Sequence, residues 1–161
     1  MKKSLIVVAL VCLLASGAIA AHGPKHQPQA TGMDVPADAA AAAAVVDAFS
    51  LALKTKDFEA IQSALASSVI VLEEGGAERD REEYMGHHAI ADALFMAKAD
   101  VKVLRRTARA DGDSAWVASE TEISMREGEP NTQLGTETMI LDKTADGWKI
   151  VHIHWSSRPK Q

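Results

Sequence analysis

Apolar residues in the first half of the chain recur at the spacing of a helix. Val45, Phe49, Ala52 and Leu53 fall on one helical face, and a run of six alanines just before them favours helix by propensity. Pro36 suits the first turn of such a helix, where its missing N–H leaves no hydrogen bond unmade. The pattern therefore predicts a first helix that presents one apolar face to a core.

Two further helical segments and one short strand are predicted before residue 100. Asp57 can cap a second short helix, whose apolar residues share a face: Phe58, Ile61 and Leu65. The β-branched and apolar residues 68–72 predict a short strand. Asp80 is followed three residues later by a glutamate, which is the spacing of a capping box. A third helical region is expected over residues 81–98, divided at Gly86.

The second half of the chain alternates between apolar and polar residues. Turn sequences rich in Asp and Gly separate the alternating runs, which is typical of strands joined by hairpins. Strands are predicted at residues 101–110, 114–126, 132–143 and 148–157. Helices followed by a run of adjacent strands indicate an α+β domain with helices packed on one face of an antiparallel sheet.

The first residues have the features of an export signal. Lys2 and Lys3 precede an apolar run over residues 5–15, and the small residues Ala18 and Ala20 follow. The apolar run is shorter than the 20 or so residues that a membrane-spanning helix requires. We therefore expect a signal peptide at residues 1–20, a flexible leader at 21–35 and a folded domain at 36–158, with a periplasmic or secreted location.

Composition restricts the possible partners. The 161 residues contain 17 Lys and Arg against 22 Asp and Glu, a net charge of −5, which disfavours nucleic acid as a partner. The single cysteine, Cys12, lies in the predicted signal, so the mature chain has no thiol. No second long apolar run follows, so no membrane association is expected after signal cleavage. The sequence predicts no cofactor.

The last predicted strands resemble a known family. Residues 135–141 read GTETMIL and residues 146–157 read DGWKIVHIHWSS, and both segments resemble SnoaL-like domains of the nuclear transport factor 2-like superfamily. They are similar in particular to the association domain of calcium/calmodulin-dependent protein kinase II. The resemblance implies a cone-shaped α+β fold, with three N-terminal helices on a curved antiparallel sheet and a pocket at the wide end. It also implies a homodimer formed through the outer face of the sheet.

The resemblance also implies which residues line the pocket. Similar domains carry inward-facing arginines at the positions of Met139 and Trp155 here, so this sequence favours an apolar or aromatic ligand over a small carboxylate. His88 matches a pocket histidine of those domains. The residues expected to line the pocket are Tyr84, His88, Phe95, Met96, Ser119, Thr121, Glu137, Met139, Leu141, Ile153 and Trp155. The leading hypothesis is an exported dimer that binds a small, mainly apolar molecule.

A general base is the first alternative. His88 and Asp92 are four residues apart, so on a helix they can hydrogen-bond, which fixes the tautomer of the imidazole and raises its basicity. An isomerase or dehydratase could use either side chain as its base. The other interpretation of the same spacing is a pair that serves packing only.

Metal binding is the second alternative. His152 and His154 share one face of a strand, and such a pair can hold zinc or copper. Strict alternation places them opposite Trp155, on the outer face of the sheet, where they could instead be interface histidines. His22 and His26 in the leader could chelate copper, although a spacer with incidental histidines is the simpler interpretation.

Three arginines lie on one predicted strand. Arg105 and Arg109 share a face, with Arg106 opposite. The first two could attract an anionic ligand, but a solvated strand edge that discourages pairing is the simpler explanation.

Overall fold

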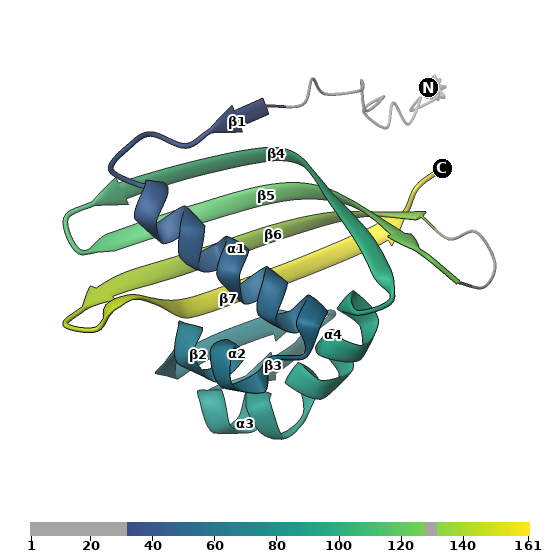
Figure 1. The fold of residues 1–161 in the computed structure, drawn as a ribbon, viewed down its shortest axis with the longest axis horizontal. Coiled ribbons are helices and arrows are strands. Elements are labelled where there is room, and N and C mark those ends of the chain that lie inside the picture. The colour runs from purple at the N-terminus through teal and green to yellow at the C-terminus, as the bar shows by residue number, and fades with distance from the viewer. Residues whose placement is uncertain (1–31, 128–131) are drawn as a thin grey trace, which may run out of the picture.

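The computed structural model describes residues 32–127 and 132–161, so the predicted signal and most of the leader lie outside the described residues. Within these ranges the chain forms four helices and seven strands (Figure 1). The helices are α1 (Ala40–Thr55), α2 (Phe58–Ala64), α3 (Arg81–Gly86) and α4 (His88–Met96). The strands are β1 (Gly32–Asp34), β2 (Leu65–Glu73), β3 (Gly76–Glu78), β4 (Ala99–Asp111), β5 (Ser114–Met125), β6 (Thr132–Thr144) and β7 (Gly147–Pro159). In this part of the chain no helix is long and apolar enough to cross a membrane.

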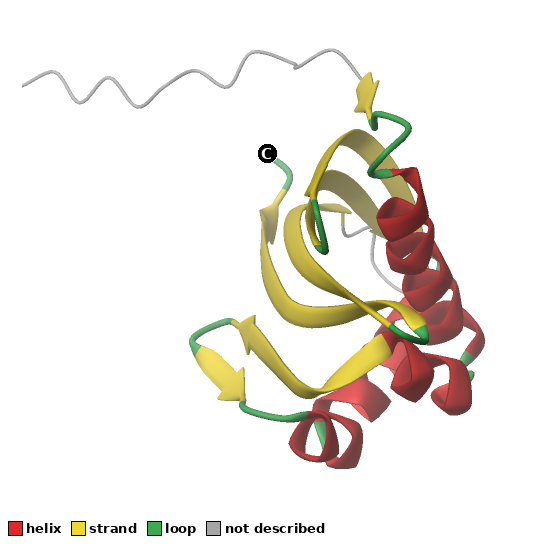
Figure 2. Cartoon of the chain, turned by 90° about the vertical axis from the view of Figure 1, so that its left-hand side faces the viewer, coloured by secondary structure: helices red, strands yellow, loops and turns green. Residues whose placement is uncertain are grey.

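The strands form a single curved sheet in the order β1-β4-β5-β6-β7-β2-β3. The helices gather on one side of that sheet, and α1 runs across it (Figures 1 and 2). The α+β prediction is therefore confirmed, but the sheet is not wholly antiparallel. β2 pairs parallel with β7, and β1, at the end of the predicted leader, pairs parallel with β4. A chain that alternates apolar and polar residues specifies a strand but not its partner, so these parallel pairings were not predicted.

The helix caps lie where the sequence indicated. Asp57 Oδ1 accepts a hydrogen bond from the Ala60 N–H at 3.0 Å, and Asp80 Oδ1 accepts one from the Glu83 N–H at 2.8 Å. The third helical region is divided into α3 and α4 at His87, one residue after Gly86. There are thus four helices among the described residues rather than three.

The secondary structure at Leu65 also differs from the prediction. It was predicted on the second helix, but α2 ends at Ala64 and Leu65 begins β2. Its side chain is fully buried in the core, so the burial was expected but the secondary structure was not. A single apolar residue at a boundary is compatible with either element.

The core lies between α1, α2 and the concave face of the sheet. Its largest fully buried side chains are Tyr84, Phe49, Ile61, Leu65, Met139, Leu141, Ile150, Ile153, Val46, Val69, Val71 and Val117. Phe49 of α1 stacks on Trp155 of β7, with the ring centroids 6.3 Å apart and the planes 15° apart. This contact joins the helical layer to the last strand, at the margin of the cavity described below.

A β-bulge in β4 changes which residues face the helices. Val103 pairs with Thr121, but the register then shifts, so that Arg105 pairs with Glu120 and Arg106 pairs with Ser119. Because one extra residue is inserted, Val103 and Arg106 point to the same face. Strict alternation would have placed them on opposite faces.

A second bulge in β7 acts in the same way. Ile140 pairs with His152 and Leu141 pairs with Ile150, so Val151 is the additional residue. Ile150 therefore joins Ile153 in the core, whereas strict alternation would place it on the same face as His152 and His154.

Candidate functional site

A cavity of about 580 Å³ opens between α1, α4 and the concave face of the sheet. It is lined by apolar, hydroxyl and charged side chains together. The lining residues are Asp47, Ser50, Leu51, Leu53, Lys54, Glu73, Glu74, His88, Ala91, Asp92, Phe95, Met96, Val101, Val103, Arg106, Thr121, Ile123, Gln133, Gly135, Thr136, Glu137, Trp155, Ser156 and Ser157. This volume is within the range of small-molecule sites.

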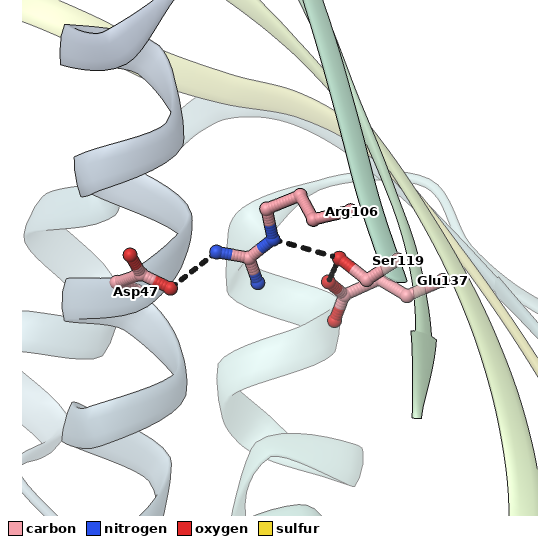
Figure 3. A network of polar contacts seen from close by, with 4 residues as sticks. All are labelled: Asp47, Arg106, Ser119 and Glu137. Carbon is pink, nitrogen blue, oxygen red and sulfur yellow. Dashed lines mark hydrogen bonds and ion pairs between the residues drawn. The ribbon is translucent and has the colours of Figure 1, made fainter. Parts of the chain in front are cut away.

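A chain of polar contacts crosses from α1 to β7 along the cavity wall, and Figure 3 shows its part from Asp47 to Glu137. Arg106 donates through Nε to Ser119 Oγ at 3.1 Å, and its Nη1 forms a short ion pair with Asp47 Oδ1. Ser119 Oγ donates in turn to Glu137 Oε1 at 3.1 Å, and Trp155 Nε1 donates to Glu137 Oε2 at 2.9 Å. Because each side chain fixes the next, the guanidinium and the carboxylate of Glu137 are held in defined positions.

Arg106 changes the expectation about the charge of the pocket. The arginines of the similar domains are indeed replaced by Met139 and Trp155, but β4 supplies another cation through its bulge. The Arg106 side chain is only 4% exposed and lines the cavity. Its hydrogen bonds to the described residues are made by Nε and Nη1, and Figure 3 draws no contact from Nη2 to Asp47, Ser119 or Glu137. The expectation drawn from Met139 and Trp155 did not include this cation.

A cluster of acidic groups lies on another part of the cavity wall. Tyr84 OH donates to Asp92 Oδ2 at 2.7 Å. Burial raises the pKa of Asp92, and the hydrogen bond from Tyr84 and the charge of His88 oppose this rise. Burial, followed by the charges of Asp92 and Glu74, raises the pKa of Glu73 to about 7. A carboxyl group with this pKa can both accept and donate a proton near neutral pH.

His88 does not have the predicted partner. Its Nδ1 is in short contact with Glu78 Oε1, and Glu78 is nearly buried, with 7% of its side chain exposed. The hydrogen bond described for Asp92 comes from Tyr84 instead, although His88 is close enough to act on the pKa of Asp92. The break at His87 rotates the start of α4, so His88 turns toward the β2–β3 hairpin. Both His88 and Asp92 nevertheless line the cavity.

The structure separates the predicted pocket residues into two groups. The cavity is lined by His88, Asp92, Phe95, Met96, Thr121, Glu137 and Trp155. Four others are fully buried in the core: Tyr84, Met139, Leu141 and Ile153. Ser119 is also buried and acts on the cavity only through Arg106 and Glu137. Alternation identifies the inner face of a strand but not how deep each residue lies beneath the helices, and this explains the second group.

Three important lining residues were missed in the sequence. Arg106 was hidden by the bulge, and Asp47 and Glu73 were not considered as pocket groups. Asp47 had a detectable signal, because it is a lone acidic residue within the apolar first helix. Glu73 ends β2, whose place beside β7 was not evident from local pattern.

His152 and His154 lie on the outer face of the sheet. His152 Nδ1 is 3.0 Å from the carbonyl oxygen of Ile70, and His154 is exposed. Among residues 32–127 and 132–161, neither belongs to a group of three His, Cys, Asp or Glu side chains close enough to share a metal ion. The leader histidines His22 and His26 lie outside the described residues.

Comparison with known proteins gives the family. A family model described as a SnoaL-like domain matches residues 42–159, and no curated protein matches the sequence significantly. A candidate ketosteroid isomerase from Shewanella frigidimarina is similar at 32% identity and a TM-score of 0.70, covering 77% of this chain and 98% of its own. A candidate dehydratase of the nuclear transport factor 2-like family from Streptomyces avermitilis is similar at 24% identity and a TM-score of 0.63, and the match covers 77% of this chain and 96% of the other. A candidate calcium/calmodulin-dependent protein kinase II association domain from Xanthomonas campestris is similar at 22% identity and a TM-score of 0.65, and the match covers 84% of this chain and 99% of the other.

These neighbours share the nuclear transport factor 2-like fold, which confirms the fold that the last two strands indicated. The family model covers well over half of the sequence and includes α4, the cavity and the whole β4–β7 meander. The chain therefore belongs to the SnoaL-like domain family.

Proposed function

We propose that this protein binds a small molecule with an apolar body and one uncharged, hydrogen-bond-accepting group in the cavity. The observation that carries the proposal is the position of Arg106, which lines a wall of apolar and polar side chains with its Nη2 not hydrogen-bonded to the described residues. Nη2 therefore has donors left for a ligand, and a carbonyl or hydroxyl oxygen in the cavity would accept a hydrogen bond from it.

Exposed apolar side chains support an apolar ligand body. Leu51, Phe95 and Val101 are all large, all line the cavity and all remain exposed to solvent. Covering such surface stabilises a complex by about 25 cal/mol per Å². The cavity therefore gains from an apolar occupant in a way that an ordinary surface depression does not.

The charge of the wall argues against an anionic ligand. Two basic side chains, Lys54 and Arg106, face a larger number of carboxylates. The carboxylates that line the cavity are those of Asp47, Glu73, Glu74, Asp92 and Glu137. Asp47 already neutralises Arg106. A neutral carbonyl or hydroxyl group thus suits the site better than a carboxylate.

A direct binding experiment tests this proposal. The mature protein is titrated with a panel of uncharged aromatic and alicyclic ketones, and binding is measured by calorimetry. Phe95→Asp should abolish binding, because it places a charge in the apolar wall. Leu94→Asp is the matched control, since Leu94 is the neighbouring exposed residue on α4 and lies outside the cavity. Binding that is equally weakened by both variants, or no binding by any ketone, would refute the proposal.

Proton transfer is a second candidate function, favoured by Glu73. A carboxylate with a pKa of about 7 beside an apolar cavity can remove a proton from the carbon next to a ligand carbonyl and return it to another carbon. Arg106 would stabilise the negative charge that develops on the carbonyl oxygen. The candidate ketosteroid isomerase that is 32% identical supports an isomerisation of this type.

Isomerisation can be assayed with a β,γ-unsaturated ketone, whose conversion to the α,β-unsaturated isomer changes its absorbance. Glu73→Gln should reduce the rate by about 10²–10⁴-fold, which is the contribution of a general base. Glu82→Gln, an exposed carboxylate on α3, serves as the control. An unchanged rate in Glu73→Gln would exclude this residue as the base.

Export and dimerisation complete the proposed function. The features of residues 1–20 support export to the periplasm or beyond.

An apolar row on the outer face of the sheet supports a homodimer: Trp116 pairs with Ile140, Ile140 with His152, and His152 with Ile70. The three apolar members of this row are exposed. Light scattering of the mature protein should give twice the monomer mass, and Ile140→Asp should give the monomer mass while Leu94→Asp does not.

A further inference from the structure

We propose that Glu78, His87 and His88 form a binding site for one divalent transition-metal ion, with Zn²⁺ as the best-matched ion. One ligand atom from each of the three side chains lies within 4.8 Å of the other two. The site is distinct from the predicted His152 and His154 pair on the outer face of the sheet. It is also distinct from the polar network of Arg106.

Two separate parts of the chain bring these side chains together. Glu78 ends the short hairpin strand β3, where it pairs in register with Val71 of β2. His87 and His88 lie at the junction of α3 and α4. The approach is therefore a product of the tertiary structure and not of adjacency in the sequence.

The break between the two helices allows both imidazoles to reach Glu78. Consecutive residues in a continuous helix point about 100° apart, so neighbouring side chains diverge. His87 leaves the helical conformation, with φ −135° and ψ −83°. As a result the two rings pack edge to face, with their centroids 4.5 Å apart. A continuous helix through residue 87 would not bring these rings together.

Burial and charge at Glu78 favour a bound cation. The Glu78 side chain is only 7% exposed, and its contact is with His88 Nδ1, which balances the carboxylate only when the imidazole is protonated. A buried carboxylate is unfavourable unless it is paired or coordinates a metal. A divalent ion between the three side chains would balance the carboxylate and would recruit His87, whose ring is at the surface.

The donor set selects the ion. Two imidazole nitrogens and one carboxylate oxygen are the ligands of three-ligand zinc sites, which keep a fourth position for water or another ligand. Mg²⁺ and Ca²⁺ prefer oxygen ligands throughout, so they suit this site poorly. His88 also lines the cavity, so the ion would lie beside the proposed ligand site. Coordination through His88 would remove that side chain from a role as general base.

Metal titration of the mature protein tests this site directly. The leader histidines are first replaced, His22→Ala and His26→Ala, so that they cannot contribute. Calorimetry with ZnCl₂ should then give one equivalent of Zn²⁺ per chain. Co²⁺ in place of Zn²⁺ should give the visible absorption of a tetrahedral site.

Variants locate the ion. Even residues that only support metal ligands change affinity by about 10–100-fold, so His87→Ala should weaken Zn²⁺ binding by at least this factor. His87 is exposed, so this variant is expected to fold, and a thermal unfolding curve in the presence of a chelator confirms it. Glu78→Gln and His88→Ala should have equal or larger effects. His154→Ala, an exposed histidine on the outer sheet face, is the control and should bind as the parent does.

Two results would overturn the proposal. One is the absence of a Zn²⁺ equivalent in the protein that lacks the leader histidines. The other is loss of binding in His154→Ala with full binding in His87→Ala. Neither result bears on the ketone-binding experiment, so the two proposals are tested independently.

Discussion

The ion pair between Asp47 and Arg106 is asymmetric, and this asymmetry predicts an unusual pattern of stability. The Arg106 side chain is 4% exposed, whereas that of Asp47 is 67% exposed. Removing Asp47 therefore leaves a buried charge, whereas removing Arg106 leaves a carboxylate that water can solvate. The two single substitutions should thus have unequal effects on the free energy of unfolding.

The magnitudes follow from the described contacts. Loss of one partner of a fully buried ion pair costs about 3–5 kcal/mol, and the solvent access at the Asp47 end reduces this to about 2 kcal/mol for Asp47→Ala. Arg106→Met keeps an apolar side chain in place and loses the hydrogen bond to Ser119, so it should cost about 1 kcal/mol. The double variant no longer contains the unpaired guanidinium and should also cost about 1 kcal/mol, less than Asp47→Ala alone.

Urea unfolding of the mature protein measures these values. All four proteins are compared at one protein concentration, because a dimer is more stable at higher concentration. The m-values should agree, so that differences in midpoint report stability. A double variant that is destabilised by the sum of the two single effects would refute the reasoning, as would an Asp47→Ala variant within about 0.5 kcal/mol of the parent.

Three further predictions concern the cavity wall and the helix caps. In Gly135→Ala the added Cβ would lie 2.6 Å from Thr121 Oγ1, so the free energy of unfolding, measured by thermal unfolding, should decrease by about 1–3 kcal/mol. Gly86→Ala is the control and should not be destabilised, because no atom lies within 4 Å of its added Cβ. The pKa of Glu73 rises from 4.5 to about 7 on folding, so the folded state binds the proton more tightly than the unfolded state. The free energy of unfolding should therefore fall as the pH rises from 4.5 to 7. Urea midpoints measured across this range should show the decrease in the parent protein, and Glu73→Gln should remove the contribution of this group. Asp80→Ala removes the cap of α3 and should cost about 1 kcal/mol in the same assay, and an unchanged midpoint would show that the cap does not contribute.

The candidate site was partly predictable because some of its residues follow regular alternation. Thr121, Glu137 and Trp155 are on the inner faces of their strands, and each lines the cavity as expected. Arg106 could not be found in this way, because an inserted residue in β4 reverses the alternation on the carboxyl-terminal side of Val103. A bulge has no reliable local signature, since it is fixed by the pairing of the whole strand with its neighbour.

Helical spacing had a similar limit at the start of α4. His88 and Asp92 are four residues apart and both line the cavity, as the periodicity indicated. Their hydrogen-bonding partners nevertheless come from elsewhere, Glu78 for His88 and Tyr84 for Asp92. Spacing predicts which face of a helix a residue occupies but not which other element meets that face.

The sequence by itself determined most elements of this protein: the apolar face of the first helix, the caps at Asp57 and Asp80, the four-strand meander and the family. These features depend on contacts between residues close in the chain, which propensity and periodicity record directly. Only the tertiary structure decided the parallel pairing of β2 with β7, the inward turn of Arg106, and the meeting of Glu78 with His87 and His88. Such contacts join residues far apart in sequence, and their free energy arises from burial and pairing that exist only after the whole sheet has closed around the helices.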